Sequence, residues 1–197
     1  MDRAAPRPHT MPLLLAVGLA HAGGVVAYLP LVTLLLPMRV EALAHLAKID
    51  LLTAAVLAGG MAASLANIVF GWLSDVSVAR GGGRRHWVIT GLVALAASYP
   101  AMAFARTPVE LVGAVVLAQA AINAVLGPLF AIIAEEVPTQ RKGMAGGLLA
   151  LGNPVAAGFS VLLMGYAGLG ETVRFLLVPV AAVALMLPLL ALRADPA

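Results

Sequence analysis

The sequence has no cysteine and few charged residues, and these two deficits limit what the protein can be. The lack of cysteine excludes disulfides, thiolate catalysis and cysteine-based metal sites. Charged side chains make up 11% of the 197 residues and hydrophobic ones 62%, whereas about a quarter of the residues of a soluble domain are charged. Because a soluble protein of this length needs a charged exterior, the composition predicts a chain that is surrounded mainly by lipid.

Long apolar runs indicate six transmembrane helices. Each run has about 18 residues or more, which is enough to cross a hydrocarbon layer roughly 30 Å thick. The runs are continuous in Leu, Ala, Val and Gly and do not alternate with polar residues, which favours helices over the strands of a barrel. The predicted helices are residues 11–38, 51–72, 87–105, 110–134, 143–166 and 174–192, and they form one bundle over 11–193 between tails at 1–10 and 194–197.

The first apolar run also has features of a secretory signal, because Ala20-His21-Ala22 resembles a signal-peptidase site. The apolar stretch continues beyond Ala22 for most of another helix length. This continuation favours an uncleaved first helix.

Basic residues in the connections predict the orientation. With the N-terminus in the cytoplasm, eight Lys and Arg lie on the inner side and four on the outer side, so the positive-inside rule favours both termini in the cytoplasm. The net charge of +3 is therefore assigned to orientation, and no nucleic-acid partner is expected. The inner residues are Arg3, Arg7, Arg80, Arg84, Arg85, Arg141, Lys142 and Arg193, and the outer ones are Arg39, Lys48, Arg106 and Arg174.

A short internal echo links the first and fourth predicted helices. The segment Pro30-Leu31-Val32-Thr33-Leu34-Leu35 is matched by Pro128-Leu129-Phe130-Ala131-Ile132-Ile133. Proline-interrupted helices at corresponding positions are typical of transporters built from inverted repeats, in which such helices border the binding site. Coincidence between two Leu-rich segments is the alternative explanation.

Two polar segments lie at the predicted inner junctions. The first is Gly71-Trp72-Leu73-Ser74-Asp75 followed by Gly83-Arg84-Arg85, and the second runs from Glu135 to Gly143. An aspartate at a helix end can pair with basic side chains and hold one conformation until those contacts break. The alternatives are a solvated turn for the first segment and an ordinary helix stop for the second.

These segments resemble the major facilitator superfamily of transporters. The first is similar to the superfamily's motif between helices two and three, and the second to its motif at the end of helix four. The first departs from that pattern because Val76 stands where a basic residue is usual and about five extra residues lengthen the connection. The matching residues are Gly71, Leu73, Asp75, Gly83, Arg84 and Arg85 in the first motif and Glu135, Pro138, Arg141 and Gly143 in the second.

The resemblance implies an all-α membrane protein with the fold of one six-helix half of such a transporter, arranged as a three-plus-three inverted repeat. In that fold the first and fourth helices line the substrate cavity. The candidate cavity residues are therefore His21, Tyr28, Gln119 and Asn123 on those helices, with Asn153 on the fifth. Polar side chains in lipid can also serve only to join helices.

Small residues predict the packing faces, and the absence of deep charges limits the transport mechanism. The spacing of Gly143 and Gly147 on the fifth helix, and of Ala55, Gly59 and Ala63 on the second, is typical of close helix contacts. No Asp, Glu, Lys or Arg lies deep in a predicted helix, so a carboxylate proton relay is not expected.

The leading functional hypothesis is transport of a small organic solute by alternating access in a bacterial inner membrane. The expected partners are the lipid bilayer, the solute, and either a second copy of the chain or a separate six-helix half. The rival is a truncated or non-transporting six-helix protein that acts as an adaptor or regulator. An intramembrane enzyme is not favoured, because the sequence has no Gly-x-Ser-x-Gly and no His-Glu-x-x-His element. No cofactor and no metal are expected.

Overall fold

In the computed structural model the described residues are 10–44, 47–166 and 168–192. This part of the chain is all-helical and contains six helical spans that are long and apolar enough to cross a membrane, which confirms the predicted class and the number of helices. The predicted tails, apart from Thr10, lie outside the described residues, and so do Arg3, Arg7 and Arg193.

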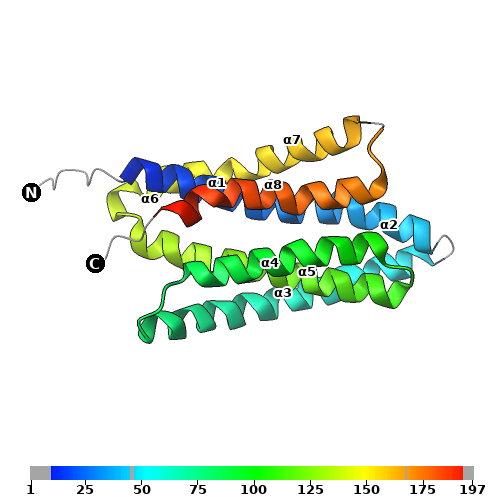
Figure 1. Ribbon diagram of the computed structural model, residues 1–197, viewed down its shortest axis with the longest axis horizontal. Coiled ribbons are helices and arrows are strands. Elements are labelled where there is room, and N and C mark those ends of the chain that lie inside the picture. Colours follow the sequence, from blue (N-terminus) through cyan, green and yellow to red (C-terminus); the bar gives the residue numbers. More distant parts are fainter. Residues whose placement is uncertain (1–9, 45–46, 167, 193–197) are drawn as a thin grey trace, which may run out of the picture.

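Four of the six spans are single helices, and the first and fifth spans consist of several helical segments (Figure 1). The first span consists of α1 (Thr10–Pro30), the π-helical segment η1 (Leu31–Leu35) and α2 (Leu36–Leu43). The next three are α3 (Lys48–Ala79), α4 (Arg85–Phe104) and α5 (Pro108–Glu136). The fifth consists of η2 (Thr139–Arg141), α6 (Lys142–Ala150) and α7 (Gly152–Gly165), and the sixth is α8 (Glu171–Ala191).

The two prolines of the internal echo have different local effects. Pro30 lacks an N–H, and the wider π-helical turn η1 follows it directly, with the Thr33 hydroxyl donating to the Leu29 carbonyl at 2.8 Å. Pro128 lies inside α5 without such a segment. The proline interruption is therefore visible in the first span only.

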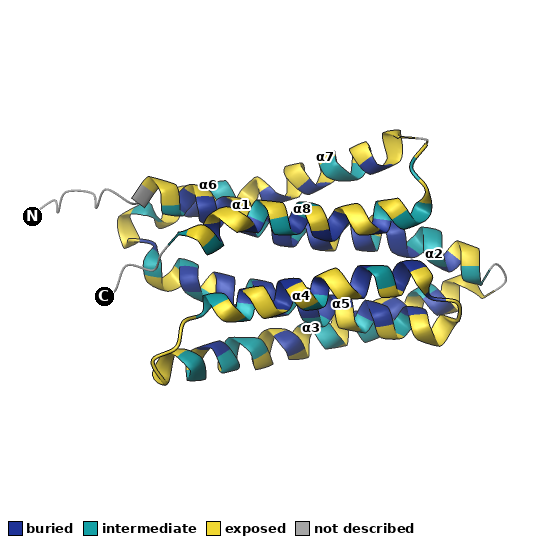
Figure 2. Cartoon of the chain, in the orientation of Figure 1, coloured by how far each residue is buried: buried dark blue, intermediate teal, exposed yellow. Residues whose placement is uncertain are grey.

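The first and fourth spans form the centre of the bundle. Helix α1 packs against α5, α6, α7 and α8, and α5 also packs against α3 and α4, while α4 contacts α8. In an 18-residue window of each span, 56% of the first span and 50% of α5 are buried, against 17% of α3 and 17% of the fifth span. Figure 2 shows the exposed residues covering much of α3 and α7.

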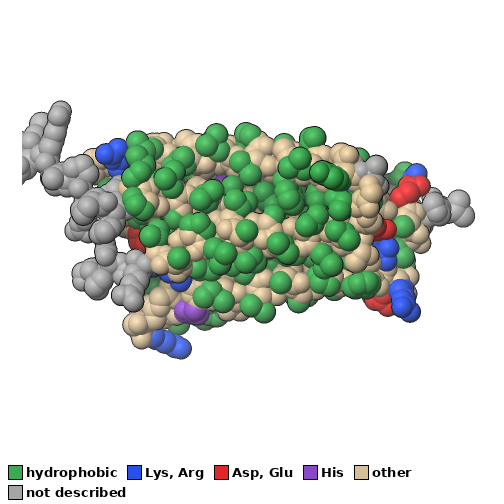
Figure 3. All heavy atoms as spheres, turned by 45° about the horizontal axis from the view of Figure 1, so that its top comes forward, with side chains coloured by type: hydrophobic (Ala, Val, Ile, Leu, Met, Phe, Trp, Pro, Cys, Tyr) green, Lys and Arg blue, Asp and Glu red, His purple; other side chains and the backbone are tan. Residues whose placement is uncertain are grey.

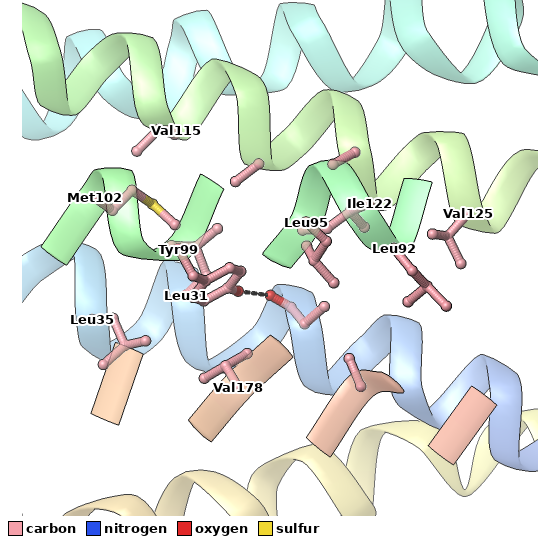
Figure 4. Packing of buried hydrophobic residues seen from close by; sticks show 14 of the residues in the cluster. Leu31, Leu35, Leu92, Leu95, Tyr99, Met102, Val115, Ile122, Val125 and Val178 are labelled. Carbon is pink, nitrogen blue, oxygen red and sulfur yellow. Dashed lines mark hydrogen bonds between the residues drawn. The ribbon is translucent and has the colours of Figure 1, made fainter. Parts of the chain in front are cut away.

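A tyrosine joins the two sides of the core. Tyr99 of α4 is fully buried, and its hydroxyl donates a hydrogen bond to the backbone carbonyl of Ala27 in α1 (Figure 4). Its ring lies 6.5 Å from that of Phe175 in α8, between centroids. Since a buried hydroxyl without a partner is costly, this bond lets a large aromatic side chain fill the space between three spans.

Charged side chains gather at the two ends of the bundle, and a belt of hydrophobic side chains covers the middle (Figure 3). We define the Arg84 end as the one that holds the α3–α4 connection, and the Arg39 end as the one that holds the α4–α5 connection. The described chain begins and ends at the Arg84 end (Figure 1).

The second span is longer than predicted, which corrects the expectation for the first polar segment. Helix α3 continues past residue 72 to Ala79, so Leu73 and Asp75 lie on its last turns together with Gly71, which the predicted helix already included. The turn that ends the helix contains Gly81, whose φ of 79° favours glycine, and the Gly82 and Gly81 amides donate to the carbonyls of Ser77 and Val78 at 2.8 and 2.9 Å. This is a Schellman cap, and it accounts for the extra residues as helix and helix end.

We predict that Gly81→Ala lowers the free energy of unfolding by about 1 kcal/mol, because an alanine is strained in the left-handed region. The matched control is Gly83→Ala. An added Cβ at either glycine would meet no atom within 4 Å, and only Gly81 of the two has a positive φ. Unfolding by SDS titration in mixed micelles measures both variants, and equal effects would contradict the cap.

Candidate functional site

The Arg84 side chain joins three helix ends at the Arg84 end of the bundle. Its Nη1 donates to Ser74 Oγ at 2.7 Å and to Asp75 Oδ1 at 2.6 Å, both on the last turns of α3. Its Nε and Nη2 donate to the two carboxylate oxygens of Glu135, near the end of α5, at 2.9 and 2.5 Å. Because Arg84 directly precedes α4, one guanidinium connects the second, third and fourth spans.

A second arginine repeats part of this connection. Arg85 is the first residue of α4, and its Nη2 donates to Glu136 Oε2, on the last residue of α5, at 3.1 Å. The α4–α5 contact at this end therefore has two adjacent arginine–glutamate pairs. We use the name Arg84 cluster for the group that consists of Ser74, Asp75, Arg84, Glu135 and the Arg85–Glu136 pair.

Burial makes this cluster stronger than a surface ion pair. The Arg84 side chain is 9% exposed, while those of Asp75 and Glu135 are 65% and 54% exposed, so the arginine is covered and the carboxylates reach water. The hydrogen bond to Glu135 is the main reason that the pKa of Arg84 is raised above its usual value. A bidentate, charge-assisted contact with low exposure holds its geometry better than a flexible surface pair.

The two predicted motifs meet in this cluster only in part. Asp75, Arg84, Arg85 and Glu135 are brought together, whereas Gly83 stands apart, because a Cβ there would meet no atom within 4 Å. Sequence reasoning missed the contacts of Ser74 and Glu136. Their only signal was their position next to Asp75 and Glu135.

The other motif residues have structural positions outside the cluster. Gly71 lies against α5, where a Cβ on Gly127 would be 3.5 Å from the Gly71 amide nitrogen, and Leu73 is half-buried. Pro138 precedes η2 and accepts a backbone bond from Arg141, and Gly143 lies in α6. Within the described residues, no hydrogen bond or ion pair connects the Arg141 side chain to the Arg84 cluster.

His21 lies where α1, α5 and α7 meet. Its ring centroid is 5.7 Å from that of Phe130 in α5. A Cβ on Gly152, the first residue of α7, would come within 2.9 Å of His21 Nδ1, so only a glycine allows this approach. The Nδ1 atom is buried and has no hydrogen-bond partner in the described part of the chain.

The amide side chains form a second group, between α3 and α5. Asn67 of α3 donates to Asn123 Oδ1 at 3.2 Å, and Asn123 Nδ2 donates to the backbone carbonyl of Gln119, one turn earlier in α5, at 2.9 Å. Gln119 is buried against α3, where a Cβ on Gly59 would lie 3.1 Å from its Cγ. The sequence predicted Gln119 and Asn123 as site residues, but the participation of Asn67 follows from the contact between the two helices.

Tyr28 and Asn153 stand apart from both groups. The Tyr28 side chain is 44% exposed, and Asn153, next to the buried Gly152, is exposed. No hydrogen bond joins either side chain to the other candidate residues within the described ranges.

The expected packing face on the fifth span is not used inside this chain. A Cβ at Gly143 or at Gly147 would meet no atom within 4 Å. The close contact on this span is instead at Gly152, the first residue of α7, which lies against α1. On the second span, Ala55 and Gly59 are buried as the packing face predicts, and Ala63 is half-buried.

Among the described residues, no group of three or more His, Asp or Glu side chains comes together in a way that could hold a metal ion. No family model, curated protein or solved structure matches the chain. The resemblance to the facilitator superfamily therefore stays a prediction.

We predict that Arg84→Gln lowers the free energy of unfolding by about 1–2 kcal/mol, because it removes the charged bonds to Glu135, Asp75 and the buried Ser74 hydroxyl. Arg84→Lys should recover only part of this loss, since one ammonium cannot hold both Glu135 oxygens and the α3 acceptors together. The control is Arg80→Gln in the neighbouring exposed turn. A loss from Arg80→Gln as large as that from Arg84→Gln would contradict a specific role for Arg84.

Proposed function

We propose that this protein moves a small organic solute across a membrane by alternating access, and that it has the fold of one half of a major facilitator transporter. The observation that carries the proposal is the pairing of helix contacts. The contact of α1 with α7 corresponds to that of α5 with α3, and the contact of α1 with α8 corresponds to that of α5 with α4. The α1–α5 contact joins spans one and four, and the α4–α8 contact joins spans three and six. Each of these two contacts therefore stays the same when the two sets of three spans are exchanged.

Exchanging spans one, two and three with spans four, five and six thus turns these six contacts into one another or into themselves, whereas the α2–α3 contact between the first and second spans is not matched to the same extent between the fourth and fifth spans in the described residues. Burial supports the same exchange, because the central spans are 56% and 50% buried in their windows and both of the second members are 17% buried. The first and fourth spans run in opposite directions (Figure 1), which supports an inverted relation between the two sets of three spans. Inverted repeats of this kind are typical of secondary transporters.

Two polar residues support the exchange at the level of single side chains. His21 and Gln119 are separated by 98 residues, as are Pro30 and Pro128 of the internal echo. His21 packs on Gly152 of the fifth span, and Gln119 packs on Gly59 of the second. Each central helix therefore carries a polar side chain against a glycine of the flanking helix.

The polar side chains that lie on or against α5 support a solute pathway beside that helix. His21, Asn67 and Asn123 belong to the first, second and fourth spans, and Asn67 is exposed. An exposed amide facing lipid tails is costly, so this side requires a wet or polar covering. A second six-helix unit, from another copy of the chain or a separate half, would enclose the pathway.

The remaining parts of the proposal concern orientation. Both ends of the described chain and five of its nine described Lys and Arg residues lie at the Arg84 end, which we assign to the cytoplasm of a bacterial inner membrane by the positive-inside rule. The Arg84 cluster would then hold the cytoplasmic end closed until rocking of the helices breaks it.

Transport by reconstituted protein tests the proposal. Proteoliposomes are screened with radiolabelled sugars, amino acids, carboxylates and organic cations, and uptake above that of empty liposomes is expected for one class. We predict that Asp75→Asn lowers this uptake about tenfold, because it removes one charge-assisted bond of the Arg84 cluster.

The control for this experiment is Asp50→Asn. Asp50 is an exposed aspartate in the first turn of the same helix, at the opposite end. Equal uptake by both variants and the unchanged protein would contradict gating by Asp75. Absence of uptake for every class would favour the non-transporting adaptor.

A further inference from the structure

The Arg39 end carries its own arginine cluster, which the sequence motifs do not include. Arg39 of α2 donates from Nη1 to Glu171 Oε1 at 3.4 Å and from Nη2 to the Ala105 carbonyl at 2.5 Å. The side chains of Arg39 and Glu171 are 17% and 34% exposed. Ala105 ends α4 and Glu171 begins α8, so one guanidinium connects the first, third and sixth spans.

The acceptors suit a cation for two reasons. The Ala105 carbonyl belongs to the C-terminal end of α4, where the aligned peptide dipoles favour positive charge. The Glu171 carboxylate adds a full negative charge. In addition, Arg174 in the first turn of α8 donates to the Tyr166 carbonyl at the end of α7, at 3.5 Å.

The exchange of spans relates this cluster to the Arg84 cluster. At the Arg84 end, residues at the start of α4 bond to the ends of α3 and α5. At the Arg39 end, residues at the start of α8 bond to the ends of α7 and of the first span. The signs are reversed in one pair, because Arg85 begins α4 and bonds to Glu136, whereas Glu171 begins α8 and bonds to Arg39.

Both clusters retain donors that are not used. Arg39 Nε and Arg85 Nε are buried without a hydrogen-bond partner in the described ranges. An arginine with spare donors can exchange partners when its end of the bundle moves.

We propose that the Arg39, Glu171 and Ala105 contacts form a second gate, which holds the Arg39 end closed as the Arg84 cluster holds the opposite end. The proposal rests on the proposed function, since a gate at each end has a role only if the two ends open in turn. Breaking one gate favours opening at that end and closure at the other.

The absence of cysteine permits a direct test, because a single introduced cysteine is the only thiol. The reporters are Ala103→Cys near the Arg39 end and Ala145→Cys near the Arg84 end, both at buried positions, 7% and 2% exposed. Each reporter is combined with Arg39→Gln or Arg84→Gln in nanodiscs, which leave both ends open to a charged, membrane-impermeant maleimide.

Arg39→Gln should raise the labelling rate of Ala103→Cys about threefold, the effect of one partly exposed ion pair, without raising that of Ala145→Cys. The charge exchange of Arg39→Glu with Glu171→Arg should restore part of the unchanged rate. Lys48→Gln is the matched control, because it breaks the Lys48–Glu41 pair at the same end, in which both side chains are about half exposed, 51% and 52%.

Four results would overturn the second gate. If Arg84→Gln raises labelling of Ala145→Cys and Arg39→Gln has no effect, the second gate is wrong and alternating access stands. If neither variant changes either reporter, both proposals fail. If Arg39→Gln raises both reporters together, or Lys48→Gln acts as strongly as Arg39→Gln, the contact is a general stabiliser. Arg39→Lys, a milder change, provides the same comparison if Arg39→Gln does not fold.

Discussion

The cost of placing an ionised side chain in hydrocarbon is the constraint on which this structure depends. It drives the charged residues to the two ends of the bundle, where water or a partner of opposite charge is within reach. The middle is held by other means, namely small residues that let helices approach and rare polar side chains that bond to backbone carbonyls. Tyr99, which bonds to the Ala27 carbonyl, is the largest of these.

This division gives the ends and the middle different mechanical roles. Contacts in the middle, such as Gly152 against His21, depend on shape and have no room for a Cβ, so they fix which surfaces face each other. Contacts at the ends depend on charge, and their carboxylates are partly exposed, so water can reach these groups when a contact breaks. A bundle built this way could move at its ends while the central packing is kept, as the proposed alternating access would require.

The sequence predicted the number of helices well because apolar length alone determines it. Helix ends were less predictable, since α3 continues through the polar segment 73–79 until the positive φ of Gly81 stops it. Both motifs of the Arg84 cluster could be identified in the sequence. The contact between them could not be predicted, because it joins residues 51 apart in the chain. Arg39 gave no signal, since its partners Ala105 and Glu171 are distant in sequence and one of them is a backbone carbonyl.

The central claim is that the side of the bundle bearing the amide side chains borders a wet pathway. Labelling of Asn123→Cys by a membrane-impermeant maleimide in nanodiscs tests it most directly, with Val93→Cys as control, a position on α4 that is 66% exposed. We expect Asn123→Cys to react and Val93→Cys, which faces lipid, to stay unlabelled. If both positions are equally unreactive, lipid covers this side and the account is wrong.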